Sequence, residues 1–225
     1  DAKEMTTANE VLLFIPNLIG YSRVGCMIAS FILMLNFPSQ WILGISLYVA
    51  SFVGDLFDGM AARKFNQTSQ FGGLLDMITD RCATLGLLFI LSGEYASSPL
   101  SPLFRLVFLF LIILDISSHW CQMFTAASFQ QHHKSSEANS SHFFLVRWYY
   151  QTYPFFGYCC VGTEFTYIAL LVLSRLNDEN KFSMYQWCWE NLLMFSIPAC
   201  FVKQLVNISQ LCSACYAVAK HDAIM

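Results

Sequence analysis

Charged residues are scarce in this sequence of 225 residues. Aspartate, glutamate, lysine and arginine make up 12% of it and hydrophobic residues 56%, whereas an ordinary soluble domain is about 25% charged. The net charge of −3 is too small to indicate a charged partner. The basic residues also form no cluster of the kind that binds nucleic acid. These absences exclude an ordinary soluble domain and indicate an integral membrane protein.

No linker or internal repeat interrupts the apolar sequence. A membrane-spanning helix needs about 20 mostly apolar residues, and on this rule we predict six spans. They lie near residues 11–35, 41–63, 71–95, 103–128, 152–174 and 190–219. The prediction is therefore an all-α bundle of six transmembrane helices that forms a single domain over residues 1–225.

Four aspartates stand out in this apolar chain. Asp55 and Asp58 are three residues apart, and Asp76 and Asp80 are four apart, so each pair shares one face if its segment is helical. The polar run 64–70 predicts a turn between two antiparallel helices, which could point all four carboxylates at one spot. At bilayer depth they would cost on the order of 10–14 kcal/mol. Bound divalent cations would offset that cost, so the pattern predicts a site for a hard cation.

Small residues and an arginine follow the first aspartate pair, at Gly59, Ala62 and Arg63. Small side chains let a neighbouring helix or a ligand approach the backbone closely. Helix packing alone explains such patches in most membrane proteins. Beside two aspartates and Arg63, however, they match what a nucleotide diphosphate needs: a cation, an arginine and access to the backbone.

The first predicted span carries polar groups that a lipid-facing helix would avoid, among them Asn17, Ser22 and Arg23. Two interpretations stay open. The helix could be kinked at Pro16, with Arg23 extending to the membrane interface. Alternatively, this end of the span lines the same pocket as the aspartates, because ionisable groups inside a membrane are functional candidates.

The basic residues near the span ends predict the orientation of the bundle. Because cytosolic loops carry an excess of lysine and arginine, both termini and the aspartate turn are expected to face the cytosol. The cytosolic group comprises Lys3, Arg63, Lys64, Lys134, Arg147 and Lys220, and the opposite group Arg105, Arg175 and Lys181.

The aspartates belong to a longer pattern, D-x-x-D-G-x-x-A-R-x8-G-x3-D-x3-D. Its eight fixed positions are Asp55, Asp58, Gly59, Ala62, Arg63, Gly72, Asp76 and Asp80. This pattern resembles the signature of the CDP-alcohol phosphotransferases. The resemblance implies six transmembrane helices, a homodimer and a site for two divalent cations, Mg²⁺ or Mn²⁺. It also implies a reaction in which an alcohol displaces CMP from a CDP-linked substrate.

Four further runs, at 16–23, 75–82, 118–120 and 146–150, resemble the eukaryotic phosphatidylinositol synthases within that family. The implied substrates are CDP-diacylglycerol and myo-inositol, and the implied location is the endoplasmic reticulum membrane with the site facing the cytosol. Two alternatives stay open. The chain could be another member of the family, making phosphatidylglycerophosphate, phosphatidylserine or phosphatidylcholine. It could also be a cation transporter, although no second copy of the aspartate pairs marks an inverted repeat.

The same resemblance implies a role for individual residues. The four aspartates would bind the metal ions, and Asp80 would also be the general base. The expected contacts of CDP-diacylglycerol are Gly20, Tyr21, Ser22, Arg23, Gly59, Ala62, Arg63, Ser69 and Gly72. The expected contacts of inositol are His119, Lys134 and Arg147.

Overall fold

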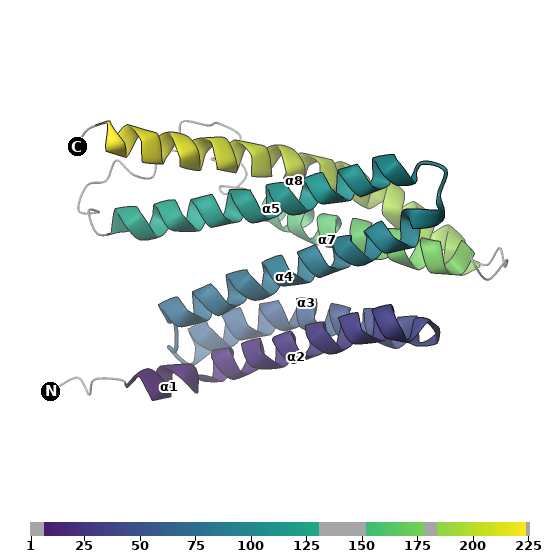
Figure 1. Ribbon diagram of the computed structural model, residues 1–225. Coiled ribbons are helices and arrows are strands. Elements are labelled where there is room, and N and C mark those ends of the chain that lie inside the picture. The colour runs from purple at the N-terminus through teal and green to yellow at the C-terminus, as the bar shows by residue number, and fades with distance from the viewer. Residues whose placement is uncertain (1–6, 131–151, 178–183, 224–225) are drawn as a thin grey trace, which may run out of the picture. The chain divides into compact units, whose positions relative to one another are not determined.

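The computed structural model describes residues 7–130, 152–177 and 184–223, and within these residues every regular element is a helix (Figure 1). The elements in chain order are α1 (Ala8–Leu12), α2 (Ile15–Asn36), the 3-10 helix η1 (Pro38–Gln40), α3 (Trp41–Lys64), α4 (Gln70–Glu94), the 3-10 helix η2 (Tyr95–Ser97), α5 (Ser101–Gln130), α7 (Tyr153–Asn177) and α8 (Met184–Asp222). The all-helical prediction is confirmed.

Five of the described helical segments are long and apolar enough to cross a membrane. They are Ile15–Asn36, Pro38–Lys64, Ser101–Ala127, Pro154–Leu176 and Met184–Asp222. The sixth predicted span, 71–95, coincides with α4, which has the length but is more polar. Any 18-residue stretch of α4 contains Asp80, Arg81 and either Asp76 or Glu94. The prediction of six spans is therefore close, and the difference is the charge on one helix.

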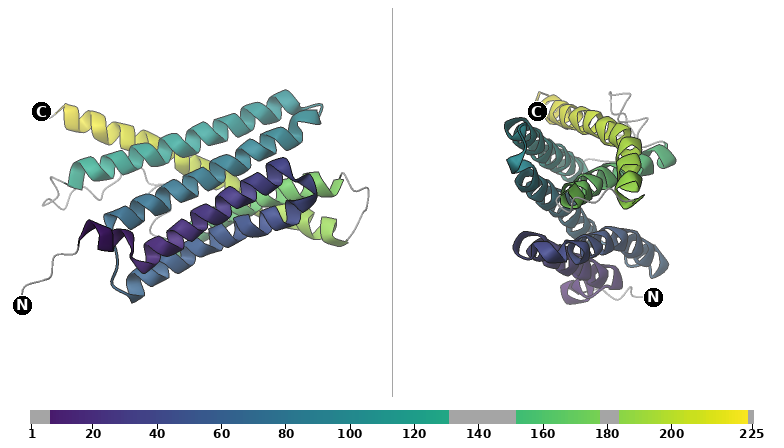
Figure 2. Two further views of the ribbon diagram at one scale, coloured as in Figure 1. Left: turned by 60° about the horizontal axis from the view of Figure 1, so that its bottom comes forward. Right: turned by 90° about the vertical axis from the view of Figure 1, so that its right-hand side faces the viewer.

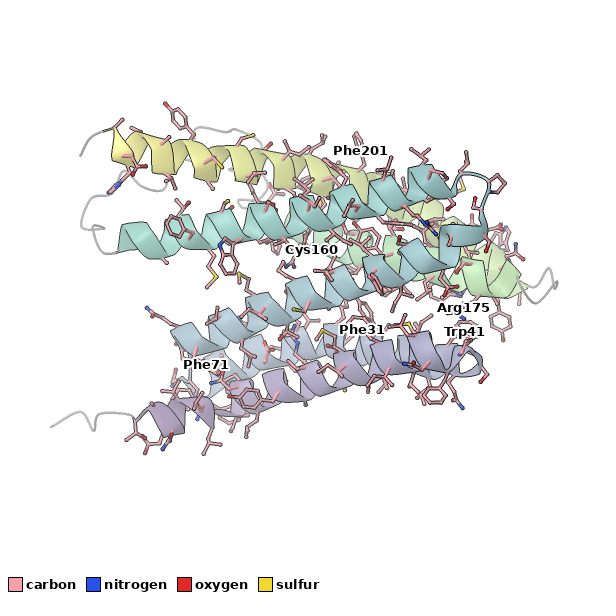
Figure 3. All side chains as sticks on the ribbon, in the orientation of Figure 1. Phe31, Trp41, Phe71, Cys160, Arg175 and Phe201 are labelled. Carbon is pink, nitrogen blue, oxygen red and sulfur yellow. The ribbon has the colours of Figure 1, made fainter. Side chains whose placement is uncertain are left out.

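Side chains of the long helices are arranged as a lipid environment requires. Large apolar side chains such as Leu56, Phe110 and Phe201 are more than half exposed, and Figure 3 labels Phe201 on α8. Polar side chains such as Asn17 and Ser118 are buried instead. In a bilayer this arrangement is favourable, because apolar groups face lipid while polar groups find partners inside the protein. The chain is a multi-pass membrane protein.

The chain forms two compact units, residues 1–90 and 91–225. In the first unit, α2 and α3 pack side by side and are joined by η1 (Figures 1 and 2). The Ser30 hydroxyl donates a hydrogen bond of 2.7 Å to the carbonyl of Gly44. A Cβ atom at Gly44 would lie 2.6 Å from Cγ of Met34. Gly44 therefore lets the two backbones approach closely, as small residues do between membrane helices.

The first part of α4 packs on α2 in the same unit. A Cβ atom at Gly86 would collide with the ring of Phe31, and one at Gly20 would lie 2.8 Å from Cδ2 of Leu75. Glycines on both helices thus create the space for their neighbours' side chains. This close packing places one face of α2 against the aspartates of α3 and α4.

In the second unit, α8 packs against both α5 and α7. A Cβ atom at Gly162 of α7 would lie only 2.5 Å from Cβ of Ala199 on α8. Close to this contact, the Thr166 hydroxyl donates a hydrogen bond of 2.9 Å to the Ser196 hydroxyl. Arg175, near the end of α7, forms an ion pair with Glu94. Small and polar residues therefore hold this unit together, as they do the first.

Candidate functional site

The turn between α3 and α4 brings the two aspartate pairs together. It occupies residues 65–69, inside the predicted run 64–70. Asn66 has a φ of 53°, in the left-handed region that asparagine adopts more readily than most residues. The Ser69 hydroxyl then accepts a hydrogen bond of 3.0 Å from the backbone N–H of Gly72 and so caps the N-terminus of α4. The chain reverses direction here, and Asp76 and Asp80 return to the level of Asp55 and Asp58.

The start of α2 is tied to this turn. The backbone N–H of Ile15 donates a hydrogen bond of 2.9 Å to the side-chain oxygen of Gln67. Asn17 is 1% exposed, and its amide donates to the carbonyl of Val11 at 2.5 Å. A Cβ atom at Gly72 would lie 2.9 Å from Oδ1 of Asn17, so only glycine fits there without a shift. These contacts fix α2 beside the aspartate pairs.

Three of the four predicted carboxylates form a compact group. One oxygen from each of Asp55, Asp76 and Asp80 lies within 4.8 Å of the others. The three side chains are 35%, 43% and 35% exposed, so a ligand can reach them. Carboxylate oxygens at such separations are the donors that Mg²⁺ and Mn²⁺ prefer. The group therefore fits a divalent cation.

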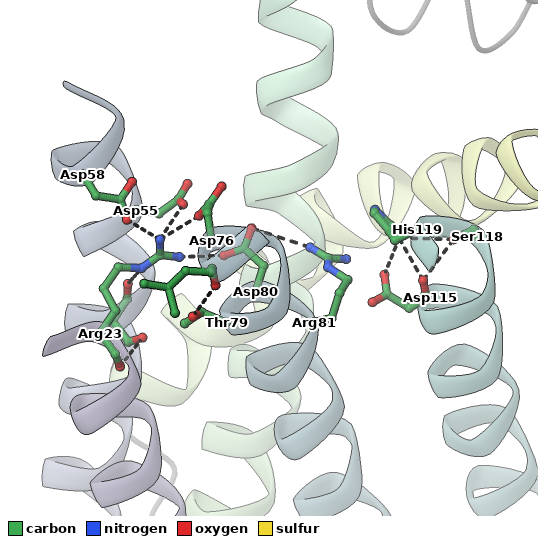
Figure 4. Close-up of polar contacts among 12 residues, drawn as sticks. Arg23, Asp55, Asp58, Asp76, Thr79, Asp80, Arg81, Asp115, Ser118 and His119 are labelled. Atoms are coloured by element: carbon green, nitrogen blue, oxygen red, sulfur yellow. Dashed lines mark hydrogen bonds and ion pairs between the residues drawn. The ribbon is translucent and has the colours of Figure 1, made fainter. Parts of the chain in front are cut away.

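Arg23 lies at the centre of all four aspartates (Figure 4). Its Nη1 atom is 3.0 Å from Asp55 Oδ1 and 2.7 Å from Asp76 Oδ1, and it also donates to Asp58. Its Nη2 atom is 2.6 Å from Asp80 Oδ1. Asp58 is thus joined to the other three carboxylates through the guanidinium group.

The position of Arg23 is held by α3. Its Nε–H donates a hydrogen bond of 3.2 Å to the carbonyl of Ser51, and the Ser51 hydroxyl donates one of 2.9 Å to the carbonyl of Arg23. A Cβ atom at Gly54 would lie 2.8 Å from Cγ of Arg23. The Arg23 side chain is 3% exposed, so it lies inside the protein among the aspartates and does not extend outward. These contacts favour the interpretation that this end of the first span faces the aspartates.

Sequence reasoning missed two features of this site. It assigned Arg81 no role, yet Nη2 of Arg81 lies 3.8 Å from Oδ2 of Asp80. It also missed Ser51 and Gly54, which hold Arg23 from the neighbouring helix. The available signal was a small residue beside an intramembrane aspartate, which by itself also fits ordinary helix packing.

The other predicted contacts of the nucleotide lipid lie in the first unit. Two of them have structural roles here: Gly20 faces Leu75, and Ser69 caps α4. The Tyr21 hydroxyl donates to the carbonyl of Leu12 at 3.1 Å, and Ser22 bonds within its own helix. Ala62 is half-buried. Arg63 is exposed, and its guanidinium lies over Gly59, 3.6 Å from the position of a Cβ atom there.

Of the predicted inositol contacts, the structure describes only His119, on α5 in the second unit. Its Nδ1 atom lies 2.8 Å from the backbone carbonyl of Asp115 and 3.6 Å from Oδ1 of the same residue. The predictions for Lys134 and Arg147 lie outside the described residues.

Comparison with known proteins places the chain in a family. The family model for CDP-alcohol phosphatidyltransferase matches residues 13–219, and no solved structure matches the chain. A protein named probable CDP-diacylglycerol–inositol 3-phosphatidyltransferase 2, from Arabidopsis thaliana, is 40% identical over 98% of this chain and 96% of its own. A protein named CDP-diacylglycerol–inositol 3-phosphatidyltransferase, from Candida albicans, is 34% identical over 98% of this chain and 88% of its own. A protein of the same name from Homo sapiens is 32% identical over 95% of this chain and 94% of its own. The chain belongs to the CDP-alcohol phosphatidyltransferase family.

Proposed function

We propose that this protein transfers the phosphatidyl group of CDP-diacylglycerol to myo-inositol, which gives phosphatidylinositol and CMP. The observation that carries the proposal is the similarity, over nearly the full chain, to plant, fungal and human proteins named for this reaction. The carboxylate group of Asp55, Asp76 and Asp80 supports it, because phosphoryl transfer depends mainly on positioning and on neutralising charge.

The four aspartates would hold two divalent cations, Mg²⁺ or Mn²⁺. Dependence on divalent metal is general in the family. Bound between these carboxylates, such ions would neutralise the charge of the diphosphate and of the departing CMP. Asp55 and Asp58 approach the site from α3, and Asp76 and Asp80 from α4, so a rigid pair of helices positions the donors.

Arg63 and Gly59 are proposed to receive the diphosphate of the lipid. A guanidinium group matches two phosphate oxygens at once, and that of Arg63 is exposed, about one helical turn beyond Gly59. Because glycine has no side chain, residue 59 leaves room above the α3 backbone, and the Arg63 guanidinium occupies it, 3.6 Å from the position of a Cβ atom. A phosphate group bound there would meet the Arg63 guanidinium beside Asp58 and Gly59.

Asp80 is proposed to accept the proton of the attacking inositol hydroxyl. Its carboxylate is 35% exposed, with Oδ1 toward Arg23 and Oδ2 toward Arg81. As the hydroxyl oxygen bonds to the phosphorus of the phosphatidyl group, the bond from that phosphorus to the CMP oxygen breaks. The hydroxyl proton passes to Asp80, a contribution of typically 10²–10⁴-fold in such reactions.

A panel of acceptor alcohols tests the proposed function. Purified protein is incubated with CDP-diacylglycerol, a divalent cation and radiolabelled inositol, glycerol 3-phosphate or serine. We expect lipid labelling and CMP release with inositol alone. Labelling with another alcohol would identify a different member of the family. Cation flux without any use of the nucleotide lipid would instead support a transporter.

His119, Lys134 and Arg147 are the proposed contacts of inositol. We expect His119→Ala to raise the KM for inositol more than the KM for CDP-diacylglycerol, because only the acceptor would touch this side chain. Initial rates over a range of each substrate measure both constants. An equal rise in the two would mean that His119, which contacts Asp115, has a structural role.

The cellular setting is proposed as the endoplasmic reticulum membrane, with the aspartates facing the cytosol and with two copies forming a homodimer. The family match over residues 13–219 covers parts of both compact units and supports their action as one domain.

Arg63 and Lys64 next to the aspartate turn support the orientation. Labelling of a cysteine introduced at Thr68 by a reagent that cannot cross the membrane tests the orientation, and cross-linking in native membranes tests the dimer.

A further inference from the structure

One buried arginine serves four carboxylates in this site. Arg23 is 3% exposed, and its two terminal nitrogens contact Asp55, Asp58, Asp76 and Asp80 (Figure 4). Buried charges are stable only when they are paired and hydrogen-bonded. Four carboxylates this close repel one another, and the guanidinium group lies where it offsets that repulsion.

Two residues of α3 hold the guanidinium group in this place. Ser51 accepts a hydrogen bond from Nε of Arg23, and Gly54 leaves space for the aliphatic part of the side chain. Arg23 is therefore oriented toward the carboxylates by α3. The interaction also joins three helices, because Arg23 comes from α2 and its partners from α3 and α4.

A divalent cation and the guanidinium group need the same carboxylates. Asp55, Asp76 and Asp80 form the group that fits a metal ion, and each of them contacts Arg23 at 3.0 Å or less. Positive charges that share these partners also repel each other. Metal binding and the present position of Arg23 therefore oppose each other.

We propose that Arg23 is an internal counter-ion that holds the four carboxylates together and competes with divalent cations for them. It is a positioning residue, and its withdrawal from the carboxylates accompanies metal binding. This inference rests on the metal site of the proposed function.

Manganese binding to the purified full-length protein, without substrate, tests this inference. Free Mn²⁺ is measured by electron paramagnetic resonance for the wild type, Arg23→Gln and the control Lys64→Gln. Lys64 is an exposed cation on the last turn of α3. We expect Arg23→Gln to lower the Kd for Mn²⁺ by ~10-fold, because a competing positive charge is removed. Lys64→Gln should change the Kd much less.

Thermal unfolding provides the second measurement. In the presence of a chelator, Arg23→Gln should unfold at a lower temperature than the wild type, because the four carboxylates lose their counter-ion. Added Mn²⁺ should then raise its unfolding temperature by more than it raises that of the wild type. If Arg23→Gln does not fold, Arg23→Lys is titrated with Mn²⁺ instead. Lysine keeps the charge but lacks the fork of donors that contacts several carboxylates at once. Because it therefore competes less well for them, the Kd of this variant for Mn²⁺ should be lower than that of the wild type.

Two outcomes separate failure of this inference from failure of the proposed metal site. If the wild type binds Mn²⁺ through Asp76, as shown by loss of binding in Asp76→Asn, but Arg23→Gln binds no more tightly, the counter-ion role is wrong. Weaker Mn²⁺ binding by Arg23→Gln would indicate a purely structural role of Arg23 and would also overturn the inference. If the wild type shows no binding that depends on Asp76, the proposed metal site is itself wrong.

Discussion

Asp80→Asn is expected to abolish CMP release while leaving the binding of CDP-diacylglycerol largely intact. Asparagine has nearly the same shape as aspartate but cannot accept the proton of the inositol hydroxyl. Loss of a general base typically costs 10²–10⁴-fold in rate, and loss of a metal-binding carboxylate adds to that cost. Radiolabelled CMP release measures turnover, and binding of the labelled lipid measures affinity.

The control for this variant is Asp222→Asn, since Asp222 is an exposed carboxylate, 67% accessible, at the end of α8. It should turn over at the wild-type rate. Recovery of Asp80→Asn at high divalent-cation concentration would show that the loss acts through metal binding. Normal turnover of the variant at ordinary metal concentration would remove the general-base assignment.

The second large effect is expected from Asp76→Asn, as an increased requirement for divalent cation. Asp76 is the most exposed of the four carboxylates, at 43%, and belongs to the group of three that fits a cation. Substitutions that only support a metal ligand cost 10–100-fold in affinity, so loss of a ligand should cost about 100-fold or more. The rate of CMP release, measured over a range of Mg²⁺ concentrations, gives the half-saturating concentration.

The same titration on Asp222→Asn is the control for this prediction. A proportional loss of rate at every Mg²⁺ concentration, with an unchanged half-saturating value, would contradict a role of Asp76 in metal binding. Such a result would place the role of its carboxylate elsewhere, for example in holding Arg23, which it contacts at 2.7 Å.

Local sequence rules predicted much of this fold. Each predicted span overlaps a long helix of the described residues, and the turn at 65–69 lies inside the predicted polar run. Spacing also predicted that all four aspartates would converge; three of them, Asp55, Asp76 and Asp80, form the compact group, and Asp58 joins them through Arg23. These predictions succeed because helical periodicity and a short turn act over a few residues. They were less accurate for α4. Because this helix carries charged residues, whether it spans the membrane depends on the residues around it and not on its own sequence alone.

The roles of individual side chains were harder to predict. Ser69 and Gly20 stay predicted lipid contacts, and the structure adds a role that the sequence did not indicate: Ser69 caps a helix and Gly20 lies at a close helix contact. The sequence left open whether Arg23 lies at the membrane interface or in the pocket. Its partners lie up to 57 residues away, and no local pattern specifies such a contact.

By itself, the sequence determined that the chain is an all-helical membrane protein with four aspartates on two neighbouring helices. Composition, periodicity and spacing are sufficient for that, because each depends on the solvent or on nearby residues. Only the tertiary structure decided that Arg23 lies among those aspartates. Its position depends on the packing of α2 against α3 and α4, where Gly54 leaves space for its side chain and Ser51 accepts its hydrogen bond.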